Sequence, residues 1–236
     1  MEAGRPPGQR PLIGITTDIA DRNGRETSLV TTAYASAVAR AGGLPVLLCA
    51  DTNLVDLYLD TLDGLVLTGG DDPRMEPFGA VTHPKATPLH PLRQAFESRL
   101  IERLQESRPA VPILGVCLGM QMLALHSGGT LDQHMPDTRL DAARHWDGDH
   151  EVLPTGAATS ALLQLDRGMV RSRHKQAVSS PGSMTTLALS DDGVIEAIAA
   201  PERPFVLGVQ WHPERTEDPR LGDRLFQALV AAAKST

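Results

Sequence analysis

Short apolar runs alternate with helix-like patterns through the first half of the chain. In one such pattern Tyr34, Ala37, Val38 and Ala41 recur at helical spacing, and two glycines follow. The apolar runs predict strands at 11–18, 44–50, 64–70 and 110–116, and the periodic segments predict helices at 31–43, 53–62, 91–107 and 118–129. Strands that alternate with helices form parallel sheets with crossover helices. The fold class predicted is therefore α/β, a doubly wound and mainly parallel sheet.

The second half has apolar runs that are separated by short polar turns instead of helices. These runs lie at 185–190, 194–200 and 205–211. They predict an antiparallel or mixed strand region attached to the parallel core. Asp218 and Pro219 suit an N-cap and a first helical residue, so a closing helix is predicted to begin there. Its apolar stripe consists of Leu221, Leu225, Phe226 and Leu229.

Two polar stretches, 69–91 and 132–152, are long for connections in a compact domain. Ordered loops of this length are often functional, and disorder is the alternative. Residues 1–10 contain two adjacent prolines and lack the apolar core of a signal peptide, which predicts a disordered tail. No linker or internal repeat divides the remainder, so residues 11–236 are expected to form a single domain.

Composition narrows the class of protein. The 236 residues are 41% hydrophobic and 22% charged, as in ordinary globular proteins, and the formal net charge is -7. An acidic chain without a basic stripe argues against nucleic-acid binding. No apolar run approaches the roughly 20 residues that span a bilayer, so no membrane association is expected. Two cysteines without metal or disulfide spacing favour a reducing, cytoplasmic setting.

Cys117 lies between Gly115 and Gly119, where a predicted strand gives way to a predicted helix. This is the shape of a nucleophile elbow with sulfur in place of oxygen, in which small neighbours accommodate a strained turn. The helix N-terminus would favour a thiolate, and the Leu118 amide would be free to stabilise an oxyanion. A packed cysteine at a strand end is the alternative, and the local pattern leaves both open. Cys49 has no such glycines and is predicted to be structural and buried.

A nucleophilic cysteine needs a base, and the base needs an orienting group. His212 and Glu214 are two positions apart after a predicted strand, so extended backbone would place them on one side. Pro213 cannot donate to a sheet ladder, which puts the pair at the strand's end. Taken alone, such a turn would be solvated and inert. Gly69 and Gly70 end another predicted strand and would let backbone approach a substrate carbonyl closely, or would form a simple turn.

These motifs together resemble class I glutamine amidotransferase-like proteins, and most closely the γ-glutamyl-γ-aminobutyrate hydrolase-like family. The resemblance runs nearly end to end through PLIGITTD, AGGLPVLL, LDGLVLTGGDDP, PFG, RQAFE, PILGVCLGMQMLALHSGGTLDQH, SRHKQAV, DGVIEAI and GVQWHPE. It implies a flavodoxin-like sheet and a catalytic triad of Cys117, His212 and Glu214. It also implies an oxyanion hole from the backbone of Gly70 and Leu118. The substrate contacts implied are Gln121, which helps hold the glutamyl group, and Ser172 and His174 of an S-x-H segment, beside the backbone of Gly69.

Four positions depart from the family's common pattern. Leu118 stands where an arginine is frequent, Arg171 replaces an asparagine, Gln94 an aspartate and Ala124 an asparagine. The triad is intact, so these departures concern the leaving group more than the chemistry. The Cys-Leu-Gly sequence at 117–119 is also usual in the glutaminase domains of biosynthetic amidotransferases.

Histidines gather between His145 and His150, and the chain has eight in all. Their spacing is not typical of zinc, so this segment is predicted to be a polar flap, with no metal and no other cofactor. His150 matches an H-x-V position of the family.

Three functions follow as hypotheses. The first is a hydrolase that cleaves the γ-glutamyl amide bond of a small γ-glutamyl compound through a thioester, releasing glutamate and an amine. The second is a glutaminase subunit that supplies ammonia to a separate synthase partner. The third, from another class, is a non-catalytic binding or regulatory module on the same scaffold. The sequence leaves a homodimer open and does not identify the amine.

Overall fold

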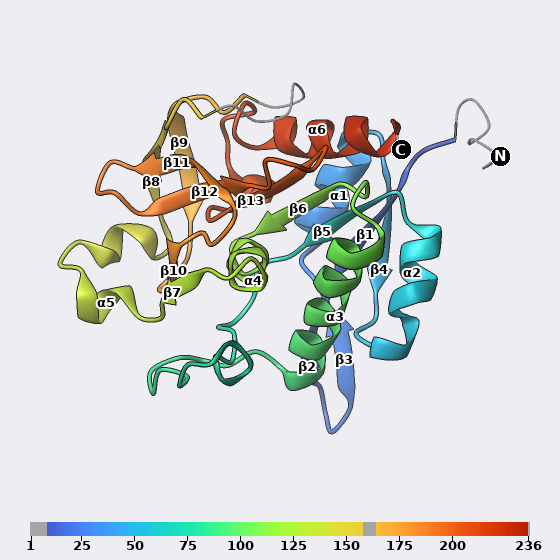
Figure 1. The fold of residues 1–236 in the computed structure, drawn as a ribbon, viewed down its shortest axis with the longest axis horizontal. Helices are drawn as coiled ribbons and strands as arrows, with labels where there is room; N and C mark the ends of the chain where they lie inside the picture. The colour runs from blue at the N-terminus through green and yellow to red at the C-terminus, as the bar shows by residue number, and fades with distance from the viewer. Residues whose placement is uncertain (1–8, 158–163, 236) are drawn as a thin grey trace.

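The computed structural model describes residues 9–157 and 164–235. Within them the chain builds one eleven-stranded sheet and a separate hairpin (Figure 1). Five strands run parallel in the order β4-β1-β5-β6-β13. They are β4 (Leu44–Leu48), β1 (Leu12–Thr16), β5 (Gly64–Leu67), β6 (Ile113–Val116) and β13 (Val206–Val209). The predicted α/β, doubly wound sheet is confirmed.

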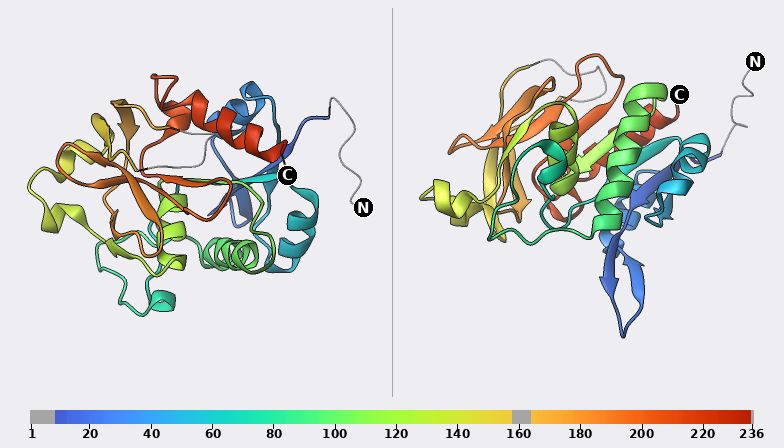
Figure 2. Two further views of the ribbon diagram at one scale, coloured as in Figure 1. Left: turned by 45° about the horizontal axis from the view of Figure 1, so that its top comes forward. Right: turned by 60° about the horizontal axis from the view of Figure 1, so that its bottom comes forward.

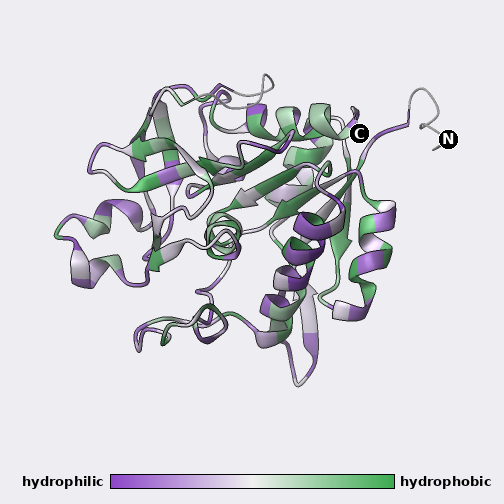
Figure 3. Ribbon diagram, in the orientation of Figure 1, coloured by the Kyte–Doolittle hydropathy of each residue, from purple (hydrophilic) through white to green (hydrophobic). Residues whose placement is uncertain are grey.

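Helices cover both faces of this parallel core (Figure 2). One layer contains α1 (Thr32–Arg40) and α6 (Asp223–Ala233), whose apolar sides share one cluster of buried residues. The other contains α2 (Val55–Thr61), α3 (Pro91–Ser107) and α4 (Leu118–His126), which pack in a second cluster. Strands that are buried on both faces have continuous apolar sequences. Figure 3 shows the central strands as largely hydrophobic.

The sheet continues as an antiparallel region beyond β13, as the C-terminal half predicts. Its strands follow in the order β12-β11-β8-β9, and β10 pairs with both β12 and β7. They are β12 (Ile195–Ala199), β11 (Thr185–Ser190), β8 (Gly148–Pro154), β9 (Gly168–Ser172), β10 (Ala177–Ser180) and β7 (Thr130–Asp132). The stretch 132–152, predicted to be a loop, also contains the short helix α5 (Met135–Thr138) and the first part of β8.

A hairpin of β2 (Asp18–Asp21) and β3 (Glu26–Leu29) was not predicted. Its turn places Asn23 at φ 58° and Gly24 at φ 75°, the left-handed pair that a tight hairpin requires. In Figure 2 the hairpin projects away from the sheet. Its side chains are mostly exposed or half-buried, so hydrophobic periodicity gives it little signal.

The closing helix begins later than predicted. Asp218 and Pro219 form a turn in which the Leu221 and Gly222 amides both donate to the Asp218 carbonyl, and α6 starts only at Asp223. The Leu221 carbonyl accepts a hydrogen bond from the buried Trp211 indole at 2.9 Å, which fixes the turn ahead of the helix. All four residues of the predicted apolar stripe are fully buried, although Leu221 lies in the turn and only the other three lie on α6.

The prediction that Cys49 is buried was wrong. The residue follows β4, an edge strand of the sheet, and its side chain is exposed. Alternation along the strand directs Leu48 into the core and its neighbour outward.

The predicted tail at 1–10 lies mostly outside the described residues. In the part of the chain that is described, every helix is too short or too polar to cross a bilayer.

Candidate active site

Cys117 occupies the turn between β6 and α4 with φ 49° and ψ −101°, a backbone conformation that non-glycine residues rarely adopt. A Cβ atom at position 115 would lie 2.7 Å from the Gly119 carbonyl carbon, and a Cβ atom at position 119 would lie 2.3 Å from the Leu67 carbonyl oxygen. The two glycines therefore let the strand and helix backbones touch. The elbow predicted from the sequence is present, and the sulfur sits at the carboxyl end of the central strands, where open α/β sheets bind ligands.

His212 and Glu214 follow β13, the strand next to the elbow. The His212 Nδ1 atom lies 2.8 Å from the Glu214 Oε1 atom, and both side chains are largely buried. The His212 amide donates to the Arg171 carbonyl at 2.8 Å, so β9 holds the backbone of the pair. Burial opposes protonation of His212, but its hydrogen bonds with Cys117 and Glu214 outweigh that cost and raise its pKa to about 9. The structure thus brings all three predicted triad residues together.

Gln210 is a polar neighbour of the sulfur that the sequence analysis missed. Its Nε2 atom lies 3.6 Å from the Cys117 sulfur, and its Oε1 atom accepts from the Gln121 amide at 3.3 Å. Gln210 is fully buried, directly follows β13 and lies two positions before His212. A polar glutamine that ends an apolar run, two positions before the histidine, was the available signal.

Gly70 and Leu118, whose amides are proposed for the oxyanion hole, are neighbours in the fold. A side chain on Gly70 would approach the Leu118 Cδ2 atom to 3.0 Å. Leu118 is the first residue of α4, so its amide precedes the first intrahelical hydrogen bond. The Gly69 amide instead donates to the Tyr34 hydroxyl at 3.0 Å. Among the described residues the Gly70 amide has no such partner.

Arg93, another residue the sequence analysis did not single out, fixes this glycine pair from α3. The fully buried guanidinium donates to the Thr68 carbonyl and hydroxyl and to the Gly69 carbonyl, each at 3.0 Å, and pairs with Glu97. A side chain on Gly70 would come within 2.3 Å of its Nη1 atom. The buried arginine therefore leaves no room for a side chain at position 70.

A cavity of about 410 Å³ opens over the sulfur. Of the predicted substrate contacts, Gly69, Gln121 and His174 line it. Ser172 does not, because its buried hydroxyl donates to the His145 carbonyl at 3.2 Å. Trp146 stands at the wall with the Lys175 Nζ atom 4.2 Å and the Arg173 guanidinium carbon 5.3 Å from its ring centroid. The other charged side chains on the wall are Asp71, Asp72, Lys85, Glu214 and Arg215.

The four departures from the family pattern lie at different distances from the chemistry. Leu118 presents its side chain toward Gly70 and is buried. Gln94 clamps the 69–91 loop by accepting from the Arg74 amide and donating to the Arg74 carbonyl, both at 2.8 Å. Arg171 directs its side chain outward to Asp147. Ala124 is buried within α4.

A cysteine at a strained elbow, with a histidine–glutamate pair directly after the adjacent parallel strand, has the site geometry of a class I glutamine amidotransferase-like protein. The chain belongs to the Peptidase C26 family, whose sequence profile matches residues 11–214. It is 36% identical to Rv2859c of Mycobacterium tuberculosis over 95% of this chain and 75% of that protein. It is 31% identical to the γ-glutamyl-γ-aminobutyrate hydrolase PuuD of Escherichia coli over 95% of this chain and 94% of that one. The solved structure of a glutamine amidotransferase from Thermotoga maritima shares the fold, with a TM-score of 0.59 at 16% identity over 87% of this chain and 77% of that chain.

Proposed function

We propose that this protein hydrolyses the γ-glutamyl amide bond of a small γ-glutamyl compound. The observation that carries the proposal is the placement of the Cys117 sulfur, on a strained elbow, beside a histidine that is itself oriented by Glu214 at 2.8 Å. That arrangement lies at the floor of a cavity large enough for a small ligand. The family is one of glutamine amidotransferase-like hydrolases, which agrees with this chemistry.

Acylation begins with attack of the Cys117 thiolate on the γ-carbonyl carbon. A carbon–sulfur bond forms, and the negative charge that develops on the carbonyl oxygen is held by the Gly70 and Leu118 amides. When the tetrahedral intermediate collapses, the carbon–nitrogen bond breaks. His212 gives its proton to the departing amine, and Glu214 keeps the imidazole in the orientation that this transfer needs.

Deacylation uses the same groups in reverse. Neutral His212 takes a proton from water as the water oxygen attacks the thioester carbonyl. The carbon–sulfur bond then breaks, glutamate leaves, and the thiolate–imidazolium pair is restored. No group beyond the chain's own residues and water is needed to balance these steps.

The experiment is a screen of γ-glutamyl amides, glutamine included, for glutamate release by the native protein and by Cys117→Ala. We expect turnover of at least one compound, and a loss of about 10⁴-fold or more in Cys117→Ala because the nucleophile is removed. Cys49→Ala is the matched control, since it removes the exposed cysteine and should retain full activity. Unchanged turnover in Cys117→Ala would contradict the proposal.

Hydroxylamine offers a direct test of the thioester. Added during turnover, it should divert the acyl-enzyme to γ-glutamyl hydroxamate in the native protein and in Cys49→Ala only. If no compound of the panel yields a trapped acyl group, the non-catalytic module would be favoured.

A glutaminase subunit remains the second candidate because the sequence at 117–119 resembles that of glutaminase domains. It predicts slow hydrolysis of glutamine alone and strong stimulation by a copurifying synthase. Fast, partner-independent cleavage of other γ-glutamyl amides would exclude it.

A further inference from the structure

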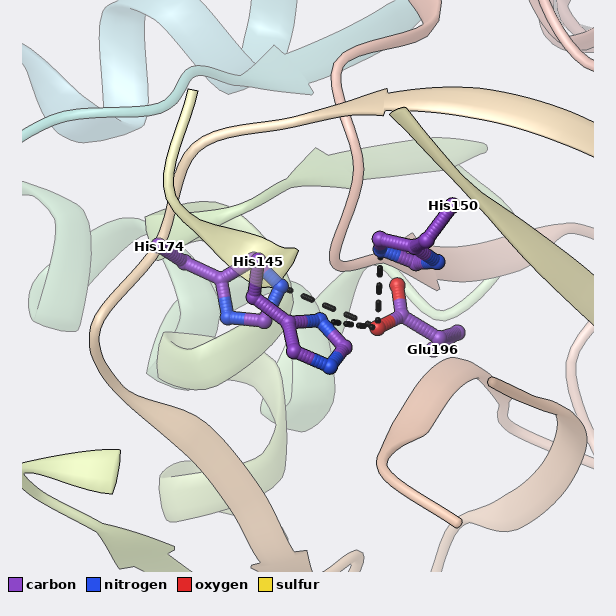
Figure 4. Close-up of side chains that lie close together, drawn as sticks. All are labelled: His145, His150, His174 and Glu196. Atoms are coloured by element: carbon purple, nitrogen blue, oxygen red, sulfur yellow. Dashed lines mark ion pairs between the residues drawn. The ribbon is translucent and has the colours of Figure 1, made fainter. Parts of the chain in front are cut away.

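Three histidines and a glutamate, none of them part of the triad, converge inside the antiparallel half of the molecule. Figure 4 shows their rings arranged around the carboxylate. The four residues, at most 4% exposed, come from distant parts of the chain. They are His145 at the end of the short helical turn 142–145, His150 on β8, His174 between β9 and β10, and Glu196 on β12.

The contacts inside this cluster are not hydrogen bonds. The His145 Nδ1, His150 Nε2 and His174 Nε2 atoms lie 3.3, 3.4 and 3.7 Å from the same Glu196 Oε1 atom. None of these nitrogens, and neither Glu196 oxygen, has a hydrogen-bond partner among the described residues. Buried polar atoms are normally paired, so five orphaned atoms that face one another call for a missing partner.

The opposite nitrogen of each ring is already engaged. His174 Nδ1 donates to the Gln176 carbonyl at 2.8 Å, and His150 Nδ1 lies 3.3 Å from the Glu151 carbonyl. His145 Nε2 lies 3.1 Å from a carboxylate oxygen of Asp192. Carbonyl and carboxylate oxygens only accept hydrogen bonds, so the outward nitrogens carry the protons. In the neutral rings, the inward nitrogens then present lone pairs toward the carboxylate.

Four electron-pair donors therefore face one another in a buried space, and a cation is needed among them. A single added proton would satisfy one nitrogen and leave the others unpaired. A metal ion would satisfy all four atoms at once. Outward bonds from ligating histidines to carbonyls and carboxylates are also the usual support of a metal centre.

The spacing fits a tetrahedral ion of a particular size. Zinc–ligand bonds of about 2.0–2.1 Å give tetrahedral edges of about 3.3–3.4 Å. The Glu196 distances to His145 and His150 match this edge, and the distance to His174 is slightly longer at 3.7 Å. All four donor atoms lie within 4.8 Å of one another. We propose that His145, His150, His174 and Glu196 bind one Zn²⁺ ion. With four protein ligands and burial from solvent, the site is structural rather than catalytic.

Such an ion would tie the segment between β9 and β10, which lines the cavity, to β8, β12 and the helical turn 142–145. His174 lies between Arg173 and Lys175, and all three residues line the cavity. The His174 amide donates to the His145 carbonyl at 2.8 Å, so the same segments already meet through backbone. Zinc would fix this wall without touching the reacting atoms. Its loss should therefore raise KM more than it lowers kcat.

The test measures zinc rather than activity, so it is independent of the proposed hydrolysis. Cys117→Ala protein, which lacks the reactive thiol as a competing ligand, is stripped with a chelator and titrated with Zn²⁺ under equilibrium dialysis. We expect one equivalent to bind and the Tm to rise. In the same background, His150→Gln and Glu196→Gln should each abolish that equivalent.

The matched control is His83→Gln. His83 belongs to a more exposed group with His134 and Asp137 that could also attract a metal ion. Zinc binding should be unchanged in this variant. If His83→Gln loses the ion, or if His150→Gln and Glu196→Gln keep it, the assignment to the buried cluster is overturned.

Folding defects in the cluster variants do not block the test. Co²⁺ bound to the parent Cys117→Ala protein should give the intense visible absorption of four-coordinate cobalt. His150→Cys should keep the ion and add a sulfur-to-cobalt charge-transfer band. A parent protein that binds no Zn²⁺ at micromolar concentration, with equal Tm in its presence and absence, would instead show a buried histidine–carboxylate network without metal.

Discussion

The triad and the buried cluster both combine histidine with a carboxylate, and they differ in how the carboxylate contacts the rings. At the triad, Glu214 contacts one histidine through a short 2.8 Å interaction, and the other ring nitrogen serves the sulfur beside an open cavity. In the buried cluster, Glu196 faces three histidines at 3.3–3.7 Å, with no aligned hydrogen bond and no access to solvent. We propose that the same residue types orient a base in one place and form a coordination shell in the other. Distance and accessibility distinguish the two.

Glu214→Gln should give the largest effect on the catalytic side of this comparison. Removing the negative charge leaves His212 poorly oriented, and we expect kcat/KM to fall by about 10³-fold. Glu196→Gln should cost far less in kcat, because its carboxylate does not reach the reacting atoms. Initial rates of glutamate release under saturating zinc would separate the two variants, and equal losses would contradict the distinction.

The pH profile sharpens the same contrast. His212, with a pKa of about 9, holds the proton for the leaving amine at lower pH and loses it as the pH rises through that value. Activity should therefore fall above about pH 9, and in Glu214→Gln the fall should begin at lower pH. The stability that this raised pKa contributes is fully present below the ordinary value of 6.5 and is lost as the pH approaches 9. A basic limb that does not move in Glu214→Gln would show that another group titrates.

Asp192→Asn tests the outer support of the cluster and should have an intermediate effect. The variant keeps the four ligands but weakens the bond that orients His145, so zinc affinity should fall about 10- to 100-fold. Asp191→Asn is the neighbouring control, since Asp191 pairs with Arg144 at the surface. Competition with a chromophoric chelator measures both. A similar loss in the control would assign the effect to charge rather than to the histidine.

Arg171→Asn should have the smallest effect, although Arg171 lies on β9, which contacts His212 and leads directly to His174 of the buried cluster. Its backbone holds His212, whereas its side chain pairs with Asp147 and Asp149 at the surface. Losing those exposed ion pairs should change the free energy of unfolding by less than about 1 kcal/mol. Urea denaturation and kcat/KM would both be near the native values. A large loss of activity would mean that the side chain acts on the substrate.

The sequence was sufficient to predict the parallel core and the proximity of Cys117, His212 and Glu214, for physical reasons. Strands covered on both faces give uninterrupted apolar runs, and crossover helices give clear periodicity. His212 and Glu214 are only two positions apart in the chain, so their contact could be predicted without knowledge of the fold. The β2–β3 hairpin was missed even though Asn23-Gly24 is a strong turn signal, because its strands bury little and lack an apolar pattern.

Other features depend on contacts between distant segments. In the sequence, Arg93 cannot be distinguished from the other charged residues of its helix. Only the fold shows that its guanidinium contacts Gly69 and Gly70. The prediction that the chain has no metal site rested on the sequence spacing of His145 and His150. The buried cluster also contains His174 and Glu196, and Glu196 lies 51 positions after His145 in the chain. Cys49 was misjudged because burial depends on which strand lies at the sheet's edge.

The strained backbone at Cys117 has a consequence for how this chain evolves. Its positive φ costs roughly 1–3 kcal/mol for a residue with a side chain, whereas glycine adopts such a conformation readily. Cys117→Gly should therefore unfold at higher urea concentration than the native protein while being inert toward amides. Under the proposed function, a lineage released from selection for activity would be free to drift toward the more stable glycine variant, and retention of the cysteine would reflect selection for activity at a cost in stability.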